Sequence, residues 1–408
     1  MKTNRLLRVS LKVAALFTAI LALVSSAWAA PKYKVLHAFG KGTDGAGLWS
    51  SVVMGPRGDL FGTTSGGGDP QCECGVVFEI TPRSDGSWSE KVLHRFHGTD
   101  GAAVFGGIIL DSQGNLYGTT AGGGTAHYGT VFELSPHTRG WKETLLYSFP
   151  QPPTSHGCCP KAAPVLDAAG NLYGTAGYPF VLRHGVNGWS ETALHIFCKN
   201  NDGCEPWAGL IWDRAGNLYG TTQHGGNNYK QCGGCGTVYE LQHLSDGTWR
   251  ESIIHNFGVS HNDGGFPSNG ALVFDHSGNL YGTTSAGTGL VYKLVRDKNG
   301  RWRESIVHRF PGGTEGDHPN GGVVFDKSGN LYGTTFYGGD AQCQCGLIYQ
   351  LSPQAGGQWK YTVLYRFTGF VDGANPAGNL VVDAQGNIYG GTVGGSPYGG
   401  GVAFEITP

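Results

Sequence analysis

The stretch Gly114-Asn115-Leu116-Tyr117-Gly118-Thr119-Thr120 decides the fold, because close copies of it recur along the chain. The copies place an aromatic residue at intervals of about 55 residues. A regular period in this range is typical of a repeat protein, in which each repeat is one small structural unit. The seven copies span residues 58–64, 114–120, 170–176, 216–222, 278–284, 329–335 and 386–392.

Each repeat contains four short segments with strand character, as the second repeat illustrates. Its segments cover residues 107–111, 115–120, 129–135 and 141–149, and turns rich in polar residues and glycine separate them. Apolar alternation between such turns predicts antiparallel strands joined as hairpins. Four strands in each of seven repeats predict an all-β fold, a seven-bladed β-propeller of four-stranded blades.

The two ends of the chain are expected to complete one blade together. The last repeat stops after its third strand, at residues 401–407, whereas residues 33–39 have the pattern of a fourth strand. The N-terminal strand should therefore complete the last blade and close the ring, which pairs two strand edges that would otherwise be exposed. An open solenoid is the alternative, and the split blade argues against it. We expect a single propeller domain over residues 30–408.

The composition fits a compact β protein and excludes several classes. Glycine makes up 71 of the 408 residues, more than twice the usual share of about 7%, which disfavours long helices. Hydrophobic residues, at 39%, are sufficient for a core, so disorder is not expected. The formal charge of −2 and the lack of a basic block argue against nucleic acid as a partner.

Residues 1–29 have the layout of a secretory signal peptide. Basic residues up to Lys12 precede an apolar run from Val13 to Val24, and Ala27-Trp28-Ala29 resembles a cleavage site. An uncleaved anchor is the alternative, although the run is shorter than the roughly 20 residues that span a bilayer. We therefore expect an exported bacterial protein, secreted, periplasmic or at the cell surface, with no transmembrane segment after cleavage.

Ten cysteines occur as five local pairs, and an even number in an exported chain predicts disulfides. Their pairing stays open, and zinc at Cys232 and Cys235 with a neighbouring pair is the alternative, although we expect no metal. Loops between second and third strands should share a face with the blade-linking loops, which gathers all ten on one face. The disulfide candidates are Cys72, Cys74, Cys158, Cys159, Cys198, Cys204, Cys232, Cys235, Cys343 and Cys345.

The blade-linking loops carry an acidic residue in six repeats and a histidine in the other. A ring of carboxylates at one mouth of the central channel could bind a cation such as calcium, or sugar hydroxyls. The alternative, which we favour, is that each Asp accepts hydrogen bonds from its own turn. The candidate ligand-binding residues are Asp44, Asp100, His156, Asp202, Asp263, Glu315 and Asp372.

Two further repeated positions are expected to be structural. An Asp shortly before the Gly-Asn pair is well placed to cap that hairpin turn. A fourth-strand position holds His37, His94, His195, His255 and His308 and also accepts Tyr, which is unlike a metal ligand. The turn residues are Asp111, Asp167, Asp213, Asp275, Asp326 and Asp383.

The sequence shows no catalytic signature. It lacks a Gly-x-Ser-x-Gly elbow, a His-Glu-x-x-His pair and a phosphate-binding Gly loop with Lys. A carboxylate pair for glycoside hydrolysis could exist among the loop acids. An active site is present once rather than seven times, so its residues should differ from those at the same position in the other repeats. Polar residues that break the repeat on the Cys-rich face are His127, His156, His224, His261 and His318.

The repeat resembles the GloVer (Gloeo/Verruco) tandem-repeat family, whose units carry Gly-Asn-Leu-Tyr-Gly-Thr-Thr followed by Gly-Thr-Val-Phe-Glu-Leu. The likeness covers nearly all of residues 33–408. It implies an exported bacterial repeat protein, and longer members are described as choice-of-anchor proteins that often end in a sorting segment. No such segment is visible before Pro408, a departure from that pattern. The resemblance implies no catalytic residues.

We therefore expect a non-catalytic exported propeller whose Cys-rich face binds a glycan or an extracellular or envelope protein, since loops on a rigid scaffold often carry function. A polysaccharide lyase or hydrolase at the channel mouth is the second hypothesis, and a structural protein of the cell envelope is the third. Perturbed carboxyl groups in a pocket would favour an enzyme, whereas an aromatic-lined face would favour binding. Calcium is the one cofactor considered, and the oligomeric state stays open.

Overall fold

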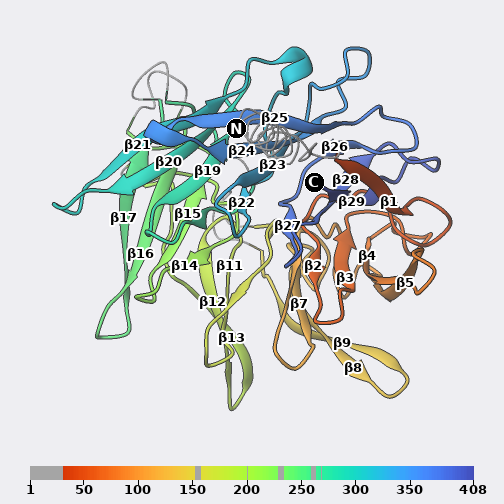
Figure 1. Ribbon diagram of the computed structural model, residues 1–408. Helices are drawn as coiled ribbons and strands as arrows, with labels where there is room; N and C mark the ends of the chain where they lie inside the picture. The colour runs from red at the N-terminus through yellow and green to blue at the C-terminus, as the bar shows by residue number, and fades with distance from the viewer. Residues whose placement is uncertain (1–30, 152–157, 200, 228–233, 259–262, 268) are drawn as a thin grey trace, which may run out of the picture.

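The computed structural model of the chain describes residues 31–151, 158–199, 201–227, 234–258, 263–267 and 269–408. Seven antiparallel sheets surround a common axis, as Figure 1 shows. No α-helix occurs within the described ranges, and none of their helical turns is long and apolar enough to cross a membrane. The predicted all-β, seven-bladed propeller is confirmed. The predicted signal peptide, residues 1–29, lies outside the described residues.

In the first six blades, four consecutive strands pair in chain order, and in blades 2 to 6 the first of them lines the central channel. Blade 1 contains β2 (Val53–Met54), β3 (Leu60–Thr64), β4 (Val76–Pro82) and β5 (Trp88–Arg95). Blade 2 contains β6 (Ile108–Leu110), β7 (Leu116–Thr120), β8 (Thr130–His137) and β9 (Gly140–Ser148). Blade 3 contains β10 (Val165–Leu166), β11 (Leu172–Thr175), β12 (Pro179–Gly185) and β13 (Gly188–Ala193).

Blades 4 to 6 repeat the same order. Blade 4 contains β14 (Ile211–Trp212), β15 (Leu218–Thr222), β16 (Thr237–His243) and β17 (Trp249–Asn256). Blade 5 contains β18 (Val273–Phe274), β19 (Leu280–Thr284), β20 (Leu290–Arg296) and β21 (Trp302–Arg309). Blade 6 contains β22 (Val324–Phe325), β23 (Leu331–Thr335), β24 (Leu347–Pro353) and β25 (Trp359–Arg366). Two 3-10 turns, η1 (Gly313–Glu315) and η2 (Ala355–Gly357), lie in loops.

Blade 7 is built from both ends of the chain. Its outer strand β1 (Lys32–Ala38) pairs antiparallel with β29 (Val402–Thr407), which pairs with β28 (Ile388–Gly394). Figure 1 shows β1 beside β29, near the C-terminus. β28 also pairs with β27 (Val381–Val382) and with β26 (Ala374–Pro376). The prediction that the N-terminal strand completes the last blade is confirmed.

The recurring motif supplies both the core of a blade and a link to the next one. In blade 2, Leu116 is fully buried. Gly118 lies under the ring of Phe132, so that a Cβ atom there would come within 2.4 Å of the ring Cζ. Thr119 donates its hydroxyl to the carbonyl of Ala162 in blade 3, at 2.9 Å. The motif therefore fixes the spacing within a blade and the position of its neighbour.

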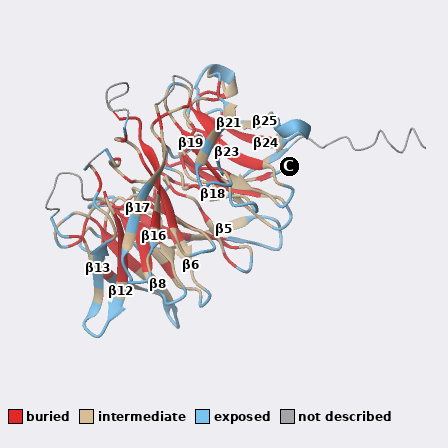
Figure 2. Ribbon diagram, turned by 90° about the vertical axis from the view of Figure 1, so that its left-hand side faces the viewer, coloured by how far each residue is buried: buried red, intermediate tan, exposed pale blue. Residues whose placement is uncertain are grey.

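In the part of the chain that the structure describes, the hydrophobic core is divided into seven clusters, and each cluster lies between two neighbouring blades. Between blades 1 and 2, the fully buried Phe96 packs against the edge of Phe132 with ring centres 5.0 Å apart. Figure 2 shows the buried residues concentrated in the middle of the sheets and the exposed ones in the outer hairpins and loops. The blades therefore stabilise one another as a ring.

Candidate functional site

The loops between second and third strands and the blade-linking loops lie on one face. Isolated β-bridges join the two kinds of loop within a blade. The bridges are Ala46–Gly66, Ala102–Gly122, Cys204–His224 and Asp317–Tyr337. The expected sharing of one face is confirmed, and we call it the Cys-rich face.

The described cysteines of this face form disulfides with close neighbours in the sequence. Cys235 is disulfide-bonded as well, while Cys232 lies outside the described residues. No described cysteine is free. Because Cys198 and Cys204 are bonded to each other, they offer no thiolate to the alternative zinc site. The bridges are Cys72–Cys74, Cys158–Cys159, Cys198–Cys204 and Cys343–Cys345.

The acids of the blade-linking loops lie against the outer strand of the blade that precedes the loop. In three junctions the loop carboxylate accepts a hydrogen bond from Nε2 of the fourth-strand histidine, at 2.9 to 3.1 Å. In a fourth, Asp372 accepts hydrogen bonds from the hydroxyls of Tyr365 and Thr368, at 2.8 and 2.7 Å. The three histidine pairs are His37–Asp44, His94–Asp100 and His195–Asp202.

Backbone groups of the loop bind the same carboxylates. The N–H of His97 donates to Asp100 Oδ1 at 2.8 Å, and the N–H of Lys199 donates to Asp202 Oδ1 at 2.9 Å. Burial raises the pKa of Asp100, but the hydrogen bonds from His94 and His97 outweigh it and leave the pKa below its ordinary value. The favoured interpretation, that these Asp residues accept hydrogen bonds within their own loops, agrees with this geometry.

A glutamate from the outer strand of the next blade faces several of these pairs. Burial raises the pKa of Glu90 to about 7, and the nearby Asp44 adds to the rise. Burial likewise raises the pKa of Glu143 and of Glu251. One buried carboxyl oxygen of each of the three has no hydrogen-bond partner. The junctions between blades thus hold carboxyl groups whose pKa values are raised.

The remaining candidate ligand-binding residues have different surroundings. Glu315 is half-buried and pairs with Arg366 at 3.1 Å. Asp263 is buried, and its Oδ1 accepts a hydrogen bond from the N–H of Gly258 at 3.0 Å. His156 lies outside the described residues. The described candidates lie at the blade junctions rather than around the channel, and a ligand-binding role for them stays a prediction.

The central channel is lined by small and aliphatic residues of the innermost strands and their preceding loops. It holds a cavity of about 370 Å³, to which every blade contributes. Among the described residues that line it, Lys161 is the single ionisable one. At the Cys-rich face the channel opens into a smaller cavity of about 170 Å³, which we call the mouth. The mouth is lined by Trp49, Phe105, Lys161, Asn269, Asn320 and Ala377.

Aromatic rings surround the mouth and hold one another in place. Trp49 contacts Phe105 edge to face and stacks on Phe336, with ring centres 5.9 and 5.8 Å apart. Lys161 Nζ lies 3.4 Å from the ring centre of Trp207, in a cation–π contact. Burial lowers the pKa of Lys161, although Glu205 opposes the shift. The mouth therefore combines flat apolar surfaces with one cation.

One equivalent position of each blade-linking loop has a positive φ in all seven loops, and its backbone holds two loops together. The N–H of His318 donates to the carbonyl of Thr288 at 3.1 Å, and its own carbonyl accepts the N–H of Phe336 at 2.9 Å. Ala103 makes the corresponding contacts at 3.0 and 3.1 Å. The seven loops share this backbone conformation, but their side chains at the position differ. These residues are Gly47, Ala103, Cys159, Glu205, Phe266, His318 and Asn375.

Sequence reasoning did not select the residues of the mouth. Trp49, Phe105 and Trp207 occupy equivalent positions of the blade-linking loops, where other repeats carry Lys161 or Asn320. This position therefore breaks the repeat, and an alignment of the seven loops would have singled it out. An active site is expected to break the repeat with polar side chains, whereas this position breaks it mainly with aromatic ones.

Comparison with known families decides what kind of propeller this is. The profile described as the Gloeobacter/Verrucomicrobia repeat matches residues 22–186 and 285–408, more than half of the chain. The chain belongs to this family. The resemblance drawn from the recurring motif is thereby confirmed.

The other comparisons carry no argument about this chain. No curated protein matches this Gloeobacter/Verrucomicrobia repeat protein. Among solved structures, it is similar to a gluconolactonase from Xanthomonas campestris, with 14% identity over 92% of this chain and 89% of that one, and a TM-score of 0.43. A likeness of this size carries no argument about activity.

The face opposite the Cys-rich one is formed by the turns of the Gloeobacter/Verrucomicrobia repeat. Asp111 accepts hydrogen bonds from the backbone and side-chain N–H groups of Asn115, at 2.8 and 2.9 Å. Tyr117 donates its hydroxyl to the same carboxylate at 3.4 Å. The other five blades with this Asp show the same pattern. The prediction that these Asp residues cap the hairpin turns is confirmed.

Proposed function

We propose that this propeller is an exported, non-catalytic glycan-binding protein that takes a sugar unit at the mouth of its channel. The observation that carries the proposal is the mouth itself, where Trp49 and Phe105 stand beside Lys161 and two asparagines. The apolar face of a sugar ring packs on aromatic side chains, while amides and a cation satisfy its polar groups. Its disulfides agree with export into an oxidising compartment.

The volume of the mouth limits the size of the ligand that it can hold. About 170 Å³ is less than the roughly 300–1,000 Å³ of pockets that enclose a drug-sized molecule. The mouth is therefore matched to the terminal unit of a glycan rather than to a long internal segment. Lys161 favours a unit that carries an acidic group, since this ammonium is held in place by Trp207.

The distribution of ionisable groups supports binding over catalysis. Glu90 and the other carboxyl groups with raised pKa values lie between outer strands, where they recur from junction to junction. Among the described residues that line the channel and its mouth, none is an acid. Glycoside hydrolysis needs a pair of carboxyl groups at one bond, so the mouth is a poor place for that chemistry.

A glycan array probed with the mature chain tests the proposal. We expect selective, saturable binding that weakens at least tenfold, about 1.4 kcal/mol, in Trp49→Ala and in Lys161→Ala. Tyr398→Ala is the matched control, because this exposed tyrosine lies on the same face but does not line the mouth. Each protein is run with calcium and with EDTA, which tests the calcium expectation for the loop acids.

Two results would contradict the proposal. An array without any saturable binding would remove the glycan and direct attention to a protein partner. Equal binding by the wild type and both mouth variants would place the glycan elsewhere on the molecule.

A further inference from the structure

The junction between blades 4 and 5 differs from three of the other four histidine junctions; at the fourth, between blades 5 and 6, Nε2 of His308 also lacks a partner. In the first three, the fourth-strand histidine and the loop Asp bond directly to each other. At the blade 4–5 junction, Nε2 of His255 is buried without a hydrogen-bond partner. A buried oxygen of Glu304 on the neighbouring outer strand has no partner either. The direct bond from the histidine Nε2 to the loop Asp is therefore missing at this position, which leaves a space between the side chains.

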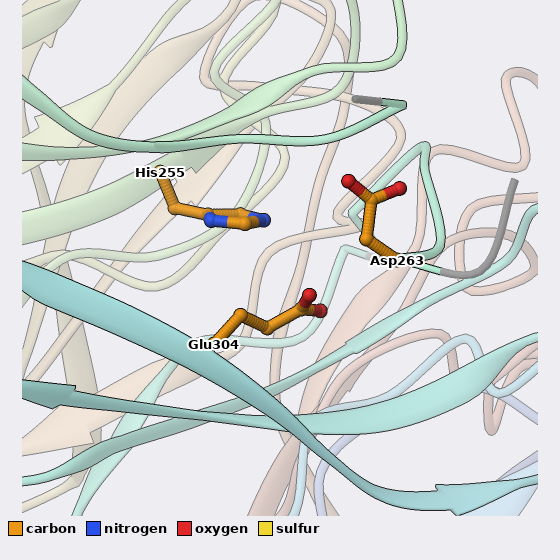
Figure 3. Close-up of side chains that lie close together, drawn as sticks. All are labelled: His255, Asp263 and Glu304. Carbon is orange, nitrogen blue, oxygen red and sulfur yellow. The ribbon is translucent and has the colours of Figure 1, made fainter. Parts of the chain in front are cut away.

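Three potential ligand atoms converge on the opening. Figure 3 shows His255 from β17, Asp263 from the following loop and Glu304 from β21 directing their polar ends toward a common space. One nitrogen of His255 and one carboxylate oxygen from each acid all lie within 4.8 Å of one another. Asp263 is 6% exposed, and Gly258 holds its Oδ1 atom by a backbone hydrogen bond. The cluster is thus a partly enclosed site in which the backbone holds one ligand, Asp263, in position.

We propose that His255, Asp263 and Glu304 bind one divalent cation of the zinc class between blades 4 and 5. One imidazole and two carboxylates are ligands that Zn²⁺ accepts at about 2.0–2.2 Å, which brings ligand atoms to ~3.4 Å from one another. Rotation of the Glu304 side chain shortens the distances between the ligand atoms to this value, and a water molecule takes the fourth coordination position. Calcium is disfavoured, since it prefers oxygen ligands alone and more of them.

The charges of the junction are suited to a divalent cation. Burial raises the pKa of Glu304 to about 8, Asp263 adds to the rise, and the cation Arg309 opposes it. Burial lowers the pKa of His255 to about 4, so the imidazole is neutral at pH 7, the form that binds metal. At pH 7 Glu304 therefore holds a proton, which a divalent cation would displace; the cation would then balance the charges of the two carboxylates in a poorly solvated place.

The position of the ligands gives the cation a structural role. β17 and β21 are the outer strands of two blades, and they belong to separate sheets. A cation held by both strands and by the loop between them would connect the outer edges of the two blades. Binding of an ion to the folded state alone raises stability by mass action, so the melting temperature should rise with the cation concentration.

Zinc titration of the mature, tag-free chain with its disulfides intact is the test. We expect calorimetry to detect one equivalent of bound Zn²⁺, and bound Co²⁺ to give the visible absorption of a low-coordinate site. His255→Gln and Glu304→Gln should each weaken the binding at least tenfold and abolish the zinc-dependent rise in melting temperature. Melting in EDTA establishes that both variants are folded.

A matched control is available at the blade 1–2 junction. Glu143 is likewise a buried glutamate with an unpartnered oxygen, but His94 and Asp100 beside it are already bonded. Glu143→Gln should therefore bind zinc like the wild type. The proposal is overturned if the wild type binds no zinc saturably, or if both blade 4–5 variants bind it unchanged. Equal loss in Glu143→Gln would also overturn it, since the binding would then not belong to this junction.

Discussion

Gly118 illustrates how a missing side chain sets the geometry of a blade. The ring of Phe132 on the neighbouring strand occupies the space where a Cβ atom would stand. An aromatic ring that covers a cross-strand glycine restores the packing that the glycine lacks. Every blade repeats this arrangement, with Phe or Tyr as the covering ring. The third residue from the end of the recurring motif is therefore glycine, because an aromatic ring from the next strand occupies the space that a side chain would need.

Gly118→Ala should destabilise the protein by about 1–3 kcal/mol, because the added methyl group forces Phe132 out of its position. Urea denaturation of the purified chain measures the change in the free energy of unfolding. Gly394→Ala is the control, since this strand glycine has a negative φ and no atom within 4 Å of a new Cβ. An equal loss of stability in both variants would contradict the explanation.

Single residues also mark the limit of what the sequence predicts. The acids of the blade-linking loops and the fourth-strand histidines are both visible as repeated positions, but the repeat pattern does not show that they touch. Their contact, as in His94–Asp100, follows from the path of the loop back over the outer strand. That path depends on backbone geometry that a repeat pattern does not specify. The convergence of Glu304 on His255 comes from a third segment and was equally invisible.

At the level of the elements, the most informative strand is β1. It pairs with β29 over its whole length, and Tyr33 stacks on Tyr365 of blade 6 with ring centres 3.9 Å apart. Tyr33 also donates its hydroxyl to the carbonyl of Asp372. The N-terminal strand thus joins the C-terminal blade to the blade before it. It closes the ring by backbone pairing and by side-chain packing together.

Deletion of residues 31–39 should leave the edge of β29 open and make the protein unstable and prone to aggregation. A synthetic peptide with the sequence of residues 31–39 should restore the melting transition, because strand addition supplies the missing backbone bonds. Scanning calorimetry and light scattering measure both effects. A peptide of scrambled sequence is the control. If the deleted chain melts like the full one, closure by β1 contributes little to stability.

Most of the elements could be predicted, because one motif repeated seven times gives their number, order and closure. The innermost strands are the exception: they are only two or three residues long, shorter than the segments expected from the sequence. Small residues at the channel, such as Gly378, bring neighbouring blades so close that little room remains for regular pairing. This crowding around the axis depends on the closed ring and is absent from any single repeat.

For the whole molecule, the buried glutamates predict how stability depends on pH. Burial is the first cause of the raised pKa in each of them, so the native state holds a proton more tightly than the unfolded chain. Their contribution to stability is complete below pH 4.5 and is lost as the pH rises toward 8. These residues are Glu90, Glu143, Glu191, Glu251 and Glu304.

Two buried histidines act in the opposite direction. Burial lowers the pKa of His255 and of His308 from 6.5 to about 4. Their contribution is complete above pH 6.5 and is lost as the pH falls toward 4. Above pH 6.5 the effect of the glutamates therefore remains, and we expect the melting temperature in EDTA to fall between pH 6.5 and 8.

Glu90→Gln should make this fall smaller, because the amide has no proton to lose. Differential scanning fluorimetry across the pH range measures both slopes. Glu73→Gln is the control, since Glu73 is exposed in a loop. A melting temperature that stays constant or rises between pH 6.5 and 8 would contradict the prediction.

The equivalent positive-φ positions of the blade-linking loops can accept different side chains. At Ala103 and His318 both backbone groups are committed to neighbouring loops, while the side chain takes no part in these bonds. Seven such positions surround the channel, and they already hold seven different amino acids. Cys159 is fixed by its disulfide, and a Cβ at Gly47 would lie 2.9 Å from the Ser65 hydroxyl oxygen, but mutation at the other five positions can alter the surface while the backbone bonds are kept. The ring thus resembles the variable loops of an antibody, and a library randomised at these positions would yield binders for new targets.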